Sequence, residues 1–179
     1  MSAAWAIGKR EIRTYFNSPV AYIVVTVYML LAGYLFWQGL FIEKQAEMRG
    51  YFGLVPILYS FIIPAITMRL LAEERGSGTL ELLITMPIRD HEVVVGKFLG
   101  ALALIGTLVG LTALYAVSVS FIGDLDRGPT LGGYFGLFLM GGAYAAIGLM
   151  ASAFTKNQIV AFIIGFAICF GLYLFGRVV

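Results

Sequence analysis

Charged side chains are scarce in this sequence of 179 residues. Asp, Glu, Lys and Arg make up 12% of it, while hydrophobic residues make up 60%. Soluble domains usually carry about a quarter charged residues. Because a water-soluble fold of this length has too little interior to hide so much apolar surface, the composition excludes a soluble globular protein and indicates a membrane protein.

Cysteine and histidine are almost absent, with one residue of each. Cys169 alone cannot form an intrachain disulfide or a Cys-rich metal site, and we expect it to be a small buried hydrophobe. His91 alone cannot build a zinc site of the usual His/Cys type or a Ser-His catalytic set. Since it lies beside Asp90 and Glu92, we expect it to be solvated. These scarcities argue against a metal centre and against catalysis.

A phosphate-binding loop of the form G-x-x-x-x-G-K-[ST] is missing as well. Gly96-Lys97 is followed by Phe98, and His91 stands where the first glycine of the motif belongs. The chain therefore does not bind and hydrolyse ATP through that motif, and we expect it to hold no cofactor of its own.

Five long uncharged runs dominate what is present. Bilayer hydrocarbon is roughly 30 Å thick, so a helix needs about 20 apolar residues to cross it. The runs are apolar on all sides, whereas barrel strands alternate in polarity. They extend over Val20–Ile42, Gly50–Met68, Phe98–Gly123, Gly128–Thr155 and Asn157–Gly176. The predicted fold is an all-α polytopic helix bundle, residues 20–179, with spans at about 20–42, 50–70, 97–123, 130–154 and 158–176.

The five runs contain no Asp, Glu, Lys, Arg or His. Such residues at membrane depth usually mark proton relays and ion pathways, and channels need a charge ring or a filter loop. Energy for transport must therefore come from elsewhere. Scattered tyrosines are polar handles that suit an amphipathic cargo, although tyrosines are equally common in interfacial belts; they are Tyr28, Tyr34, Tyr59, Tyr115, Tyr144 and Tyr173.

The charges between the runs predict a cytoplasmic N-terminus. In that orientation eight Lys and Arg residues are cytoplasmic and four are external, which satisfies the positive-inside rule. The cytoplasmic ones are Lys9, Arg10, Arg13, Arg69, Arg75, Arg89, Lys97 and Lys156, and the external ones are Lys44, Arg49, Arg127 and Arg177.

Residues 1–19 form a separate segment in which 4–17 predict an amphipathic helix lying in the cytoplasmic interface. We expect its aromatic residues to enter the acyl boundary while its basic side chains reach the headgroups. The aromatic residues are Trp5, Tyr15 and Phe16, and the basic ones are Lys9, Arg10 and Arg13. Ser18 is the expected N-cap and Pro19 the first residue of the first membrane helix.

The long polar segment 69–97 predicts a short helix at about 79–86. Gly76-Ser77-Gly78 breaks the chain, Thr79 can cap a new helix, and Glu81 falls in its first turn, where a carboxylate favours the helix dipole. Pro87 ends it. Its apolar face consists of Leu80, Leu83 and Ile84. An amphipathic helix of this kind fits a groove on another protein.

Small residues recur at four-residue spacing, which lets membrane helices approach closely. The pairs are Gly96/Gly100, Gly106/Gly110, Gly132/Gly136, Gly141/Ala145 and Gly148/Ser152. The pairs predict a compact bundle, and each of them could mark either internal packing or a subunit interface.

The run Glu73-Glu74-Arg75-Gly76-Ser77-Gly78-Thr79-Leu80-Glu81-Leu82-Leu83, followed by Met86-Pro87 and Gly96-Lys97, resembles the coupling-helix region of ABC type-2 exporter permeases. The likeness is greatest to GldF-like permeases of gliding-motility transporters and to NosY-type permeases. The opening Lys9-Arg10-Glu11 through Tyr15-Phe16-Asn17-Ser18-Pro19 to Ala21-Tyr22 is similar to the connecting helix and first span of that family. The resemblance implies six membrane helices, of which five runs are visible.

By this resemblance, the segment Thr79 to Met86 docks into a cleft of a separate ATPase subunit, with Glu73, Glu74 and Glu81 as polar anchors. The resemblance implies ATP and Mg bound by that partner, a second permease chain, identical or related, and in some systems an auxiliary periplasmic or membrane protein. Nucleic acid is not an expected partner. The implied location is the bacterial cytoplasmic membrane, and the implied function is export of an unidentified substrate.

Two other functions stay open at this point. A non-transporting scaffold could use the same coupling to transmit ATPase-driven motion to an envelope or motility machine. A membrane-embedded enzyme acting on lipids would need paired polar catalytic groups at the interface, and the sequence offers no persuasive set.

Overall fold

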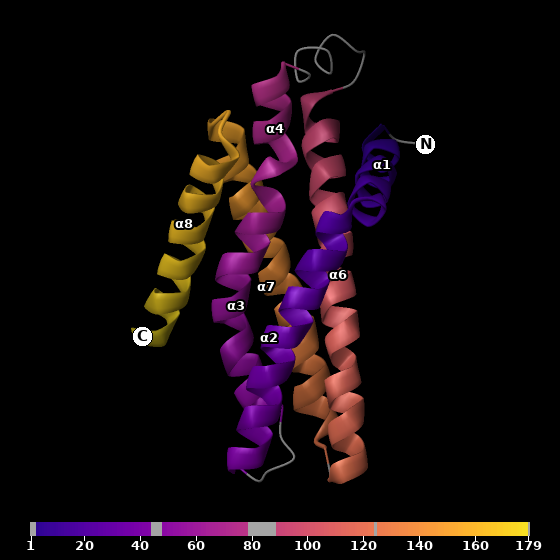
Figure 1. Ribbon diagram of the computed structural model, residues 1–179, viewed down its shortest axis with the longest axis vertical. Coiled ribbons are helices and arrows are strands. Elements are labelled where there is room, and N and C mark those ends of the chain that lie inside the picture. The colour runs from indigo at the N-terminus through magenta and orange to yellow at the C-terminus, as the bar shows by residue number, and fades with distance from the viewer. Residues whose placement is uncertain (1–2, 44–47, 79–88, 124, 179) are drawn as a thin grey trace.

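The computed structural model describes residues 3–43, 48–78, 89–123 and 125–178, and the regular elements within these ranges are α-helices. The predicted all-α class is confirmed. In chain order they are α1 (Ala3–Asn17), α2 (Pro19–Glu43), α3 (Arg49–Thr67), α4 (Arg69–Ser77), α6 (Asp90–Ile122), α7 (Arg127–Phe154) and α8 (Gln158–Val178). Figure 1 shows α1 beside α6 at the same end of the bundle as α4, which we call the upper end.

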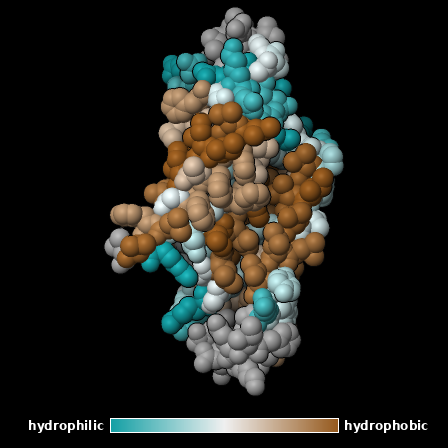
Figure 2. All heavy atoms as spheres, turned by 60° about the vertical axis from the view of Figure 1, so that its left-hand side comes forward, coloured by the Kyte–Doolittle hydropathy of each residue, from teal (hydrophilic) through white to brown (hydrophobic). Residues whose placement is uncertain are grey.

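Five stretches are long and apolar enough to cross a membrane, as the sequence predicts. They are Pro19–Gln38, Arg49–Ser77, Asp90–Phe121, Arg127–Phe154 and Gln158–Val178. In Figure 2 hydrophobic side chains occupy the middle of the visible face, with hydrophilic ones above and below. This banding fits a bundle whose middle lies in lipid and whose ends reach water.

Helical structure continues past two of the apolar runs, beyond the bounds predicted for the spans. α6 begins at Asp90, whereas the third predicted span begins at about 97, and α4 continues after the second run to Ser77. At about 1.5 Å per residue, the 33 residues of α6 measure roughly 50 Å, well beyond the hydrocarbon thickness. The helices extend this far because hydrogen-bonded backbone does not require apolar side chains once it leaves lipid.

Local signals fix two helix ends where the sequence predicts them. The backbone N–H of Val20 donates to Ser18 Oγ at 3.3 Å, and α2 begins at Pro19. The predicted break at Gly76-Ser77-Gly78 is confirmed, because α4 ends at Ser77 and Gly78 takes a left-handed φ of 74°. The predicted docking helix, 79–86, and Pro87 lie outside the described residues.

Small residues allow close packing in the bundle interior. A Cβ added to Gly148 would collide with Thr67 Oγ1, and one added to Gly141 would lie 2.7 Å from Ile105 Cγ2. The pairs containing these glycines therefore serve internal packing. By contrast, a Cβ on Gly132 or Gly136 would meet nothing within 4 Å.

The tyrosines of the membrane runs differ in exposure, and some of them are buried. Tyr28 and Tyr59 are fully buried, and the Tyr28 hydroxyl lies 3.2 Å from that of Tyr51. Tyr34, by contrast, is 67% exposed. Tyr28 and Tyr59 are therefore part of the packed core. Tyr34 lies on the outer surface, where a tyrosine of an interfacial belt would lie.

Candidate functional site

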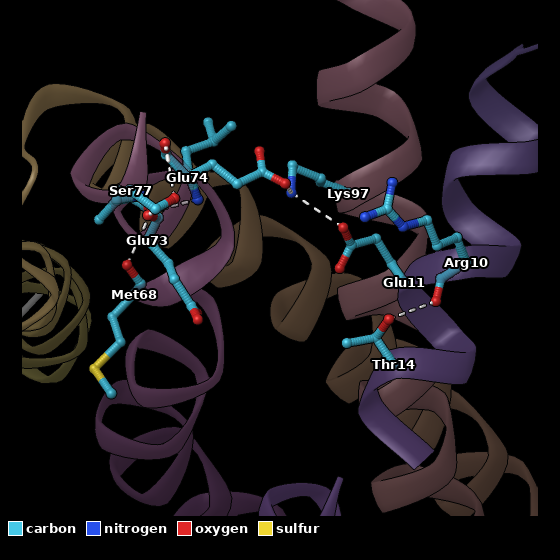
Figure 3. Close-up of polar contacts among 11 residues, drawn as sticks. Arg10, Glu11, Thr14, Met68, Glu73, Glu74, Ser77 and Lys97 are labelled. Carbon is cyan, nitrogen blue, oxygen red and sulfur yellow. Dashed lines mark hydrogen bonds and ion pairs between the residues drawn. The ribbon is translucent and has the colours of Figure 1, made fainter. Parts of the chain in front are cut away.

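The upper end of the bundle contains a buried lysine that joins three helices. Lys97 of α6 is 3% exposed, and its Nζ donates to Glu11 Oε1 of α1 at 3.0 Å and to Glu74 Oε1 of α4 at 2.8 Å. Figure 3 shows Lys97 between the two carboxylates. A buried ammonium is tolerated only when it is paired and hydrogen-bonded. We call Glu11, Glu74 and Lys97 the ion triad.

Glycines bring α1 close enough to α6 for this contact. A Cβ added to Gly96 would lie 2.6 Å from Ile7 Cγ2, and one added to Gly100 would lie 2.6 Å from Glu11 Cβ. On the facing helix, a Cβ on Gly8 would lie 3.3 Å from the Gly96 carbonyl oxygen. The pair Gly96/Gly100 is therefore a helix-packing motif that seats α1 on α6.

A second polar contact attaches α1 to the end of α3. The Tyr15 hydroxyl donates to the Ile66 carbonyl oxygen at 3.1 Å, and the side chain is only 2% exposed. Burial raises the pKa of the Tyr15 phenol, which keeps it protonated as a donor. The Arg69 guanidinium lies over its ring, 5.2 Å from the centroid.

A serine of α7 forms hydrogen bonds to the backbone at the boundary between α3 and α4. Ser152 Oγ accepts hydrogen bonds from the backbone N–H groups of Leu71 and Ala72, both at 2.9 Å, and donates to the Met68 carbonyl oxygen at 2.9 Å. In a regular helix those N–H groups would bond to carbonyls four residues earlier. A side chain inserted into this ladder is a recognised cause of helix kinks.

These contacts attach α4 to three other helices. The ion triad joins it to α1 and α6, and Ser152 joins it to α7. Because α4 ends at Ser77, directly before Gly78 and the predicted docking segment, any displacement of that segment would act first on the helix that carries these attachments. We call the ion triad and the hydrogen bonds of Ser152 together the junction.

A polar cleft of about 360 Å³ opens between α1 and α4 at the junction. Carboxylates and cations both line it, including Arg10, Arg69 and Glu73 beside the ion triad. Among the described residues, no group of three or more His, Cys, Asp or Glu side chains gathers as a metal site would require. The mixed charges of this cleft suit contacts between helices.

The predicted interfacial residues divide between the two faces of α1. Trp5, Lys9, Arg10 and Arg13 are exposed, and Phe16 is half-buried. The sequence predicts Tyr15 in the acyl boundary, and the structure instead buries it against α3, because its hydroxyl finds a carbonyl acceptor there.

The predicted docking residues are only partly described. Glu73 is exposed, whereas Glu74 is half-buried and engaged by Lys97. The others after Gly78 lie outside the described residues: Thr79, Leu80, Glu81, Leu83, Ile84 and Pro87.

Sequence reasoning did not identify Lys97, Glu11 or Ser152 as site residues. One signal was available for Glu11, since it is the only acidic residue of the first 19 and shares a helical face with Gly8 and Tyr15 rather than with the basic residues. Lys97 adjoins the glycine pair that packs against that face. An acid and a base flanking a close helix contact indicate a buried pair.

The family described as "ABC-2 family transporter protein" matches residues 3–179. Among curated proteins, the chain is similar to "Probable ABC transporter permease protein NosY" of Pseudomonas aeruginosa, with 26% identity over 149 residues. The match covers 78% of this chain and 54% of that relative, so the chain spans about half the length of the curated protein it matches.

Proposed function

This chain belongs to the ABC-2 family of transporter proteins as a permease subunit, and from that membership we propose that it moves a substrate across the membrane with ATP hydrolysed by a separate subunit. The observation that carries the proposal is the ion triad, which ties α4, the helix leading into the docking segment, to α1 and α6. The substrate class we propose is amphipathic, because the five membrane runs contain no ionisable side chain that could serve a small ion.

The junction supports a mechanical route from the ATPase to the membrane. When two ATPase subunits close on ATP, the segment 79–86 moves with them and carries the end of α4. Separating Lys97 from either carboxylate would leave a buried charge unpaired, which is strongly unfavourable. The lower-energy response is for α1 and α6 to move together with α4. The break at Met68, held by Ser152, is the point where this movement can bend the helix.

The orientation of the chain and its partners follow from this function. The upper end faces the cytoplasm of a bacterium, since eight of the twelve Lys and Arg residues then lie inside. A second permease chain, identical or related, completes the pathway, and each permease chain engages one ATPase. Glu73, exposed beside the cleft, is available to that ATPase, whereas Glu74 holds the junction together.

The docking claim is tested by purifying this chain with and without Leu83→Glu and asking whether the ATPase copurifies. Because the substitution puts a charge on the apolar docking face, we expect the ATPase no longer to copurify and the ATP hydrolysis of the membrane fraction to be lost, while membrane insertion is unchanged. Leu131→Glu is the matched control, because Leu131 is 72% exposed in the first turns of α7, away from the junction. Normal copurification with Leu83→Glu would refute the docking claim.

Transport itself is distinguished from a scaffold role by reconstitution. Vesicles containing the complete complex should move a labelled lipid or amphipathic peptide when ATP is added and should not do so with a non-hydrolysable analogue. A complex that hydrolyses ATP and moves neither probe would favour the scaffold that transmits motion to an envelope or motility machine.

A further inference from the structure

The outer face of α1 carries an uninterrupted basic strip. Lys9, Arg10 and Arg13 are all exposed and line one shallow depression of about 570 Å³. The remaining lining residues are small or polar, and they are Ala6, Thr14, Asn17 and Ser18. Three cations within five residues make a concentrated positive surface on α1, and Arg10, at its edge, also lines the polar cleft between α1 and α4.

Among the described residues, no carboxylate lines this depression. The one acidic residue of α1, Glu11, is directed to the opposite side and bonds to Lys97. Within the part of the chain that the structure describes, Lys9, Arg10 and Arg13 form no ion pair. The ion triad therefore removes from the outer face of α1 the only acid of that helix that could balance its three cations.

The strip leads directly into lipid-facing surface. It ends at Ser18, and α2, the first candidate span, begins at the next residue. Tyr22 and Ile23, each 60% exposed, follow within the first two turns of α2. Figure 1 shows α1 at the upper end with α2 descending from it along the bundle. Cations at the start of a span, followed by exposed apolar side chains, match a phosphate headgroup with its acyl chain below it.

We propose that the basic strip of α1 is a binding site for an anionic phospholipid of the adjoining leaflet. The three cations contact the headgroup phosphate, and the apolar surface of α2 receives the acyl chain. Each cation near an anionic membrane surface contributes about fivefold in affinity, so the site selects anionic over zwitterionic lipid. Lipid binding at this strip does not depend on which subunit hydrolyses ATP.

Tryptophan fluorescence tests the site directly. The chain has two tryptophans, and Trp37→Phe leaves Trp5, which is 52% exposed and one turn before Lys9 on α1. The full chain is placed in phosphatidylcholine vesicles that contain a small fraction of brominated lipid, either phosphatidylglycerol or phosphatidylcholine. We expect brominated phosphatidylglycerol to quench Trp5 severalfold more strongly at equal mole fraction, and high salt to reduce the difference.

The variant Lys9→Gln, Arg10→Gln, Arg13→Gln should abolish that difference. Its matched control, Arg49→Gln, Arg127→Gln, Arg177→Gln, removes the same number of charges outside α1 and should retain it. If the two brominated lipids quench Trp5 equally in the chain with Lys9, Arg10 and Arg13 intact, the proposal is overturned. Equal quenching is the result expected if the strip binds an acidic protein. A preference that survives in the α1 variant would overturn it as well.

Discussion

Lys97 joins three helices through one buried ammonium group. Its ammonium is almost completely buried, while Glu11 and Glu74 keep 17% and 21% of their side chains exposed. Lysine is rarely buried unless paired. Its place in α6, one residue after a glycine that contacts α1, puts the charge where α1 and α4 both reach it.

Replacing Lys97 by Met should destabilise the fold by about 3 kcal/mol, because two carboxylates lose their partner. Their partial exposure places the effect at the lower end of the range for buried pairs. Thermal unfolding in detergent measures it, and Lys9→Met, at an exposed cation, is the matched control. Adding Glu11→Gln and Glu74→Gln should restore most of the lost stability, as expected for residues that act as one unit. A Lys97→Met chain as stable as the unsubstituted one would contradict a structural role for the triad.

At the scale of elements, α1 depends on glycine for its position. The contact with α6 has no room for a Cβ at Gly100, whereas a Cβ added to Gly110, farther along the same helix, would meet nothing within 4 Å. Two glycines of one helix therefore have different roles, and only one of them seats α1.

Gly100→Ala should displace α1 and destabilise the chain by about 1–3 kcal/mol through overpacking. Gly110→Ala should be neutral or stabilising by up to about 1 kcal/mol, because alanine favours a helix more than glycine does. Trypsin cleavage at Lys9, Arg10 and Arg13 reports the displacement, and we expect it to accelerate only in Gly100→Ala. Equal cleavage rates in the two variants would show that α1 does not rely on this contact.

Elements were predictable from the sequence wherever a local cause decides them. Lipid requires about 20 apolar residues per span, so five runs predict five spans, and Ser18, Pro19 and Gly78 set helix ends by their own chemistry. The extension of α6 to Asp90 was not predictable, because polar residues can continue a helix outside lipid. The hydrogen bonds of Ser152 were not predictable for a different reason, since its partners are 80 or more residues away in sequence.

The molecule as a whole combines a membrane bundle with a polar junction at one end. The bundle middle is apolar and closely packed, while α4 and the beginning of α6 extend beyond it and carry the buried charges. Such a division suits a protein that receives movement at one end and changes shape in the membrane. We propose that the ion triad transmits that movement to α1 and α6.

The distance between two spin labels in the complex, measured by double electron–electron resonance, tests whether the ion triad transmits this movement. Cys169 is fully buried and is replaced by Ala, and spin labels are attached at Tyr34→Cys on α2 and Leu139→Cys on α7, both at exposed positions. We expect that trapping ATP in the partner subunit changes the distance between the labels, and that Lys97→Met abolishes the change while the ATPase still copurifies. The same nucleotide-dependent change in the Lys97→Met complex would show that the ion triad does not transmit the movement.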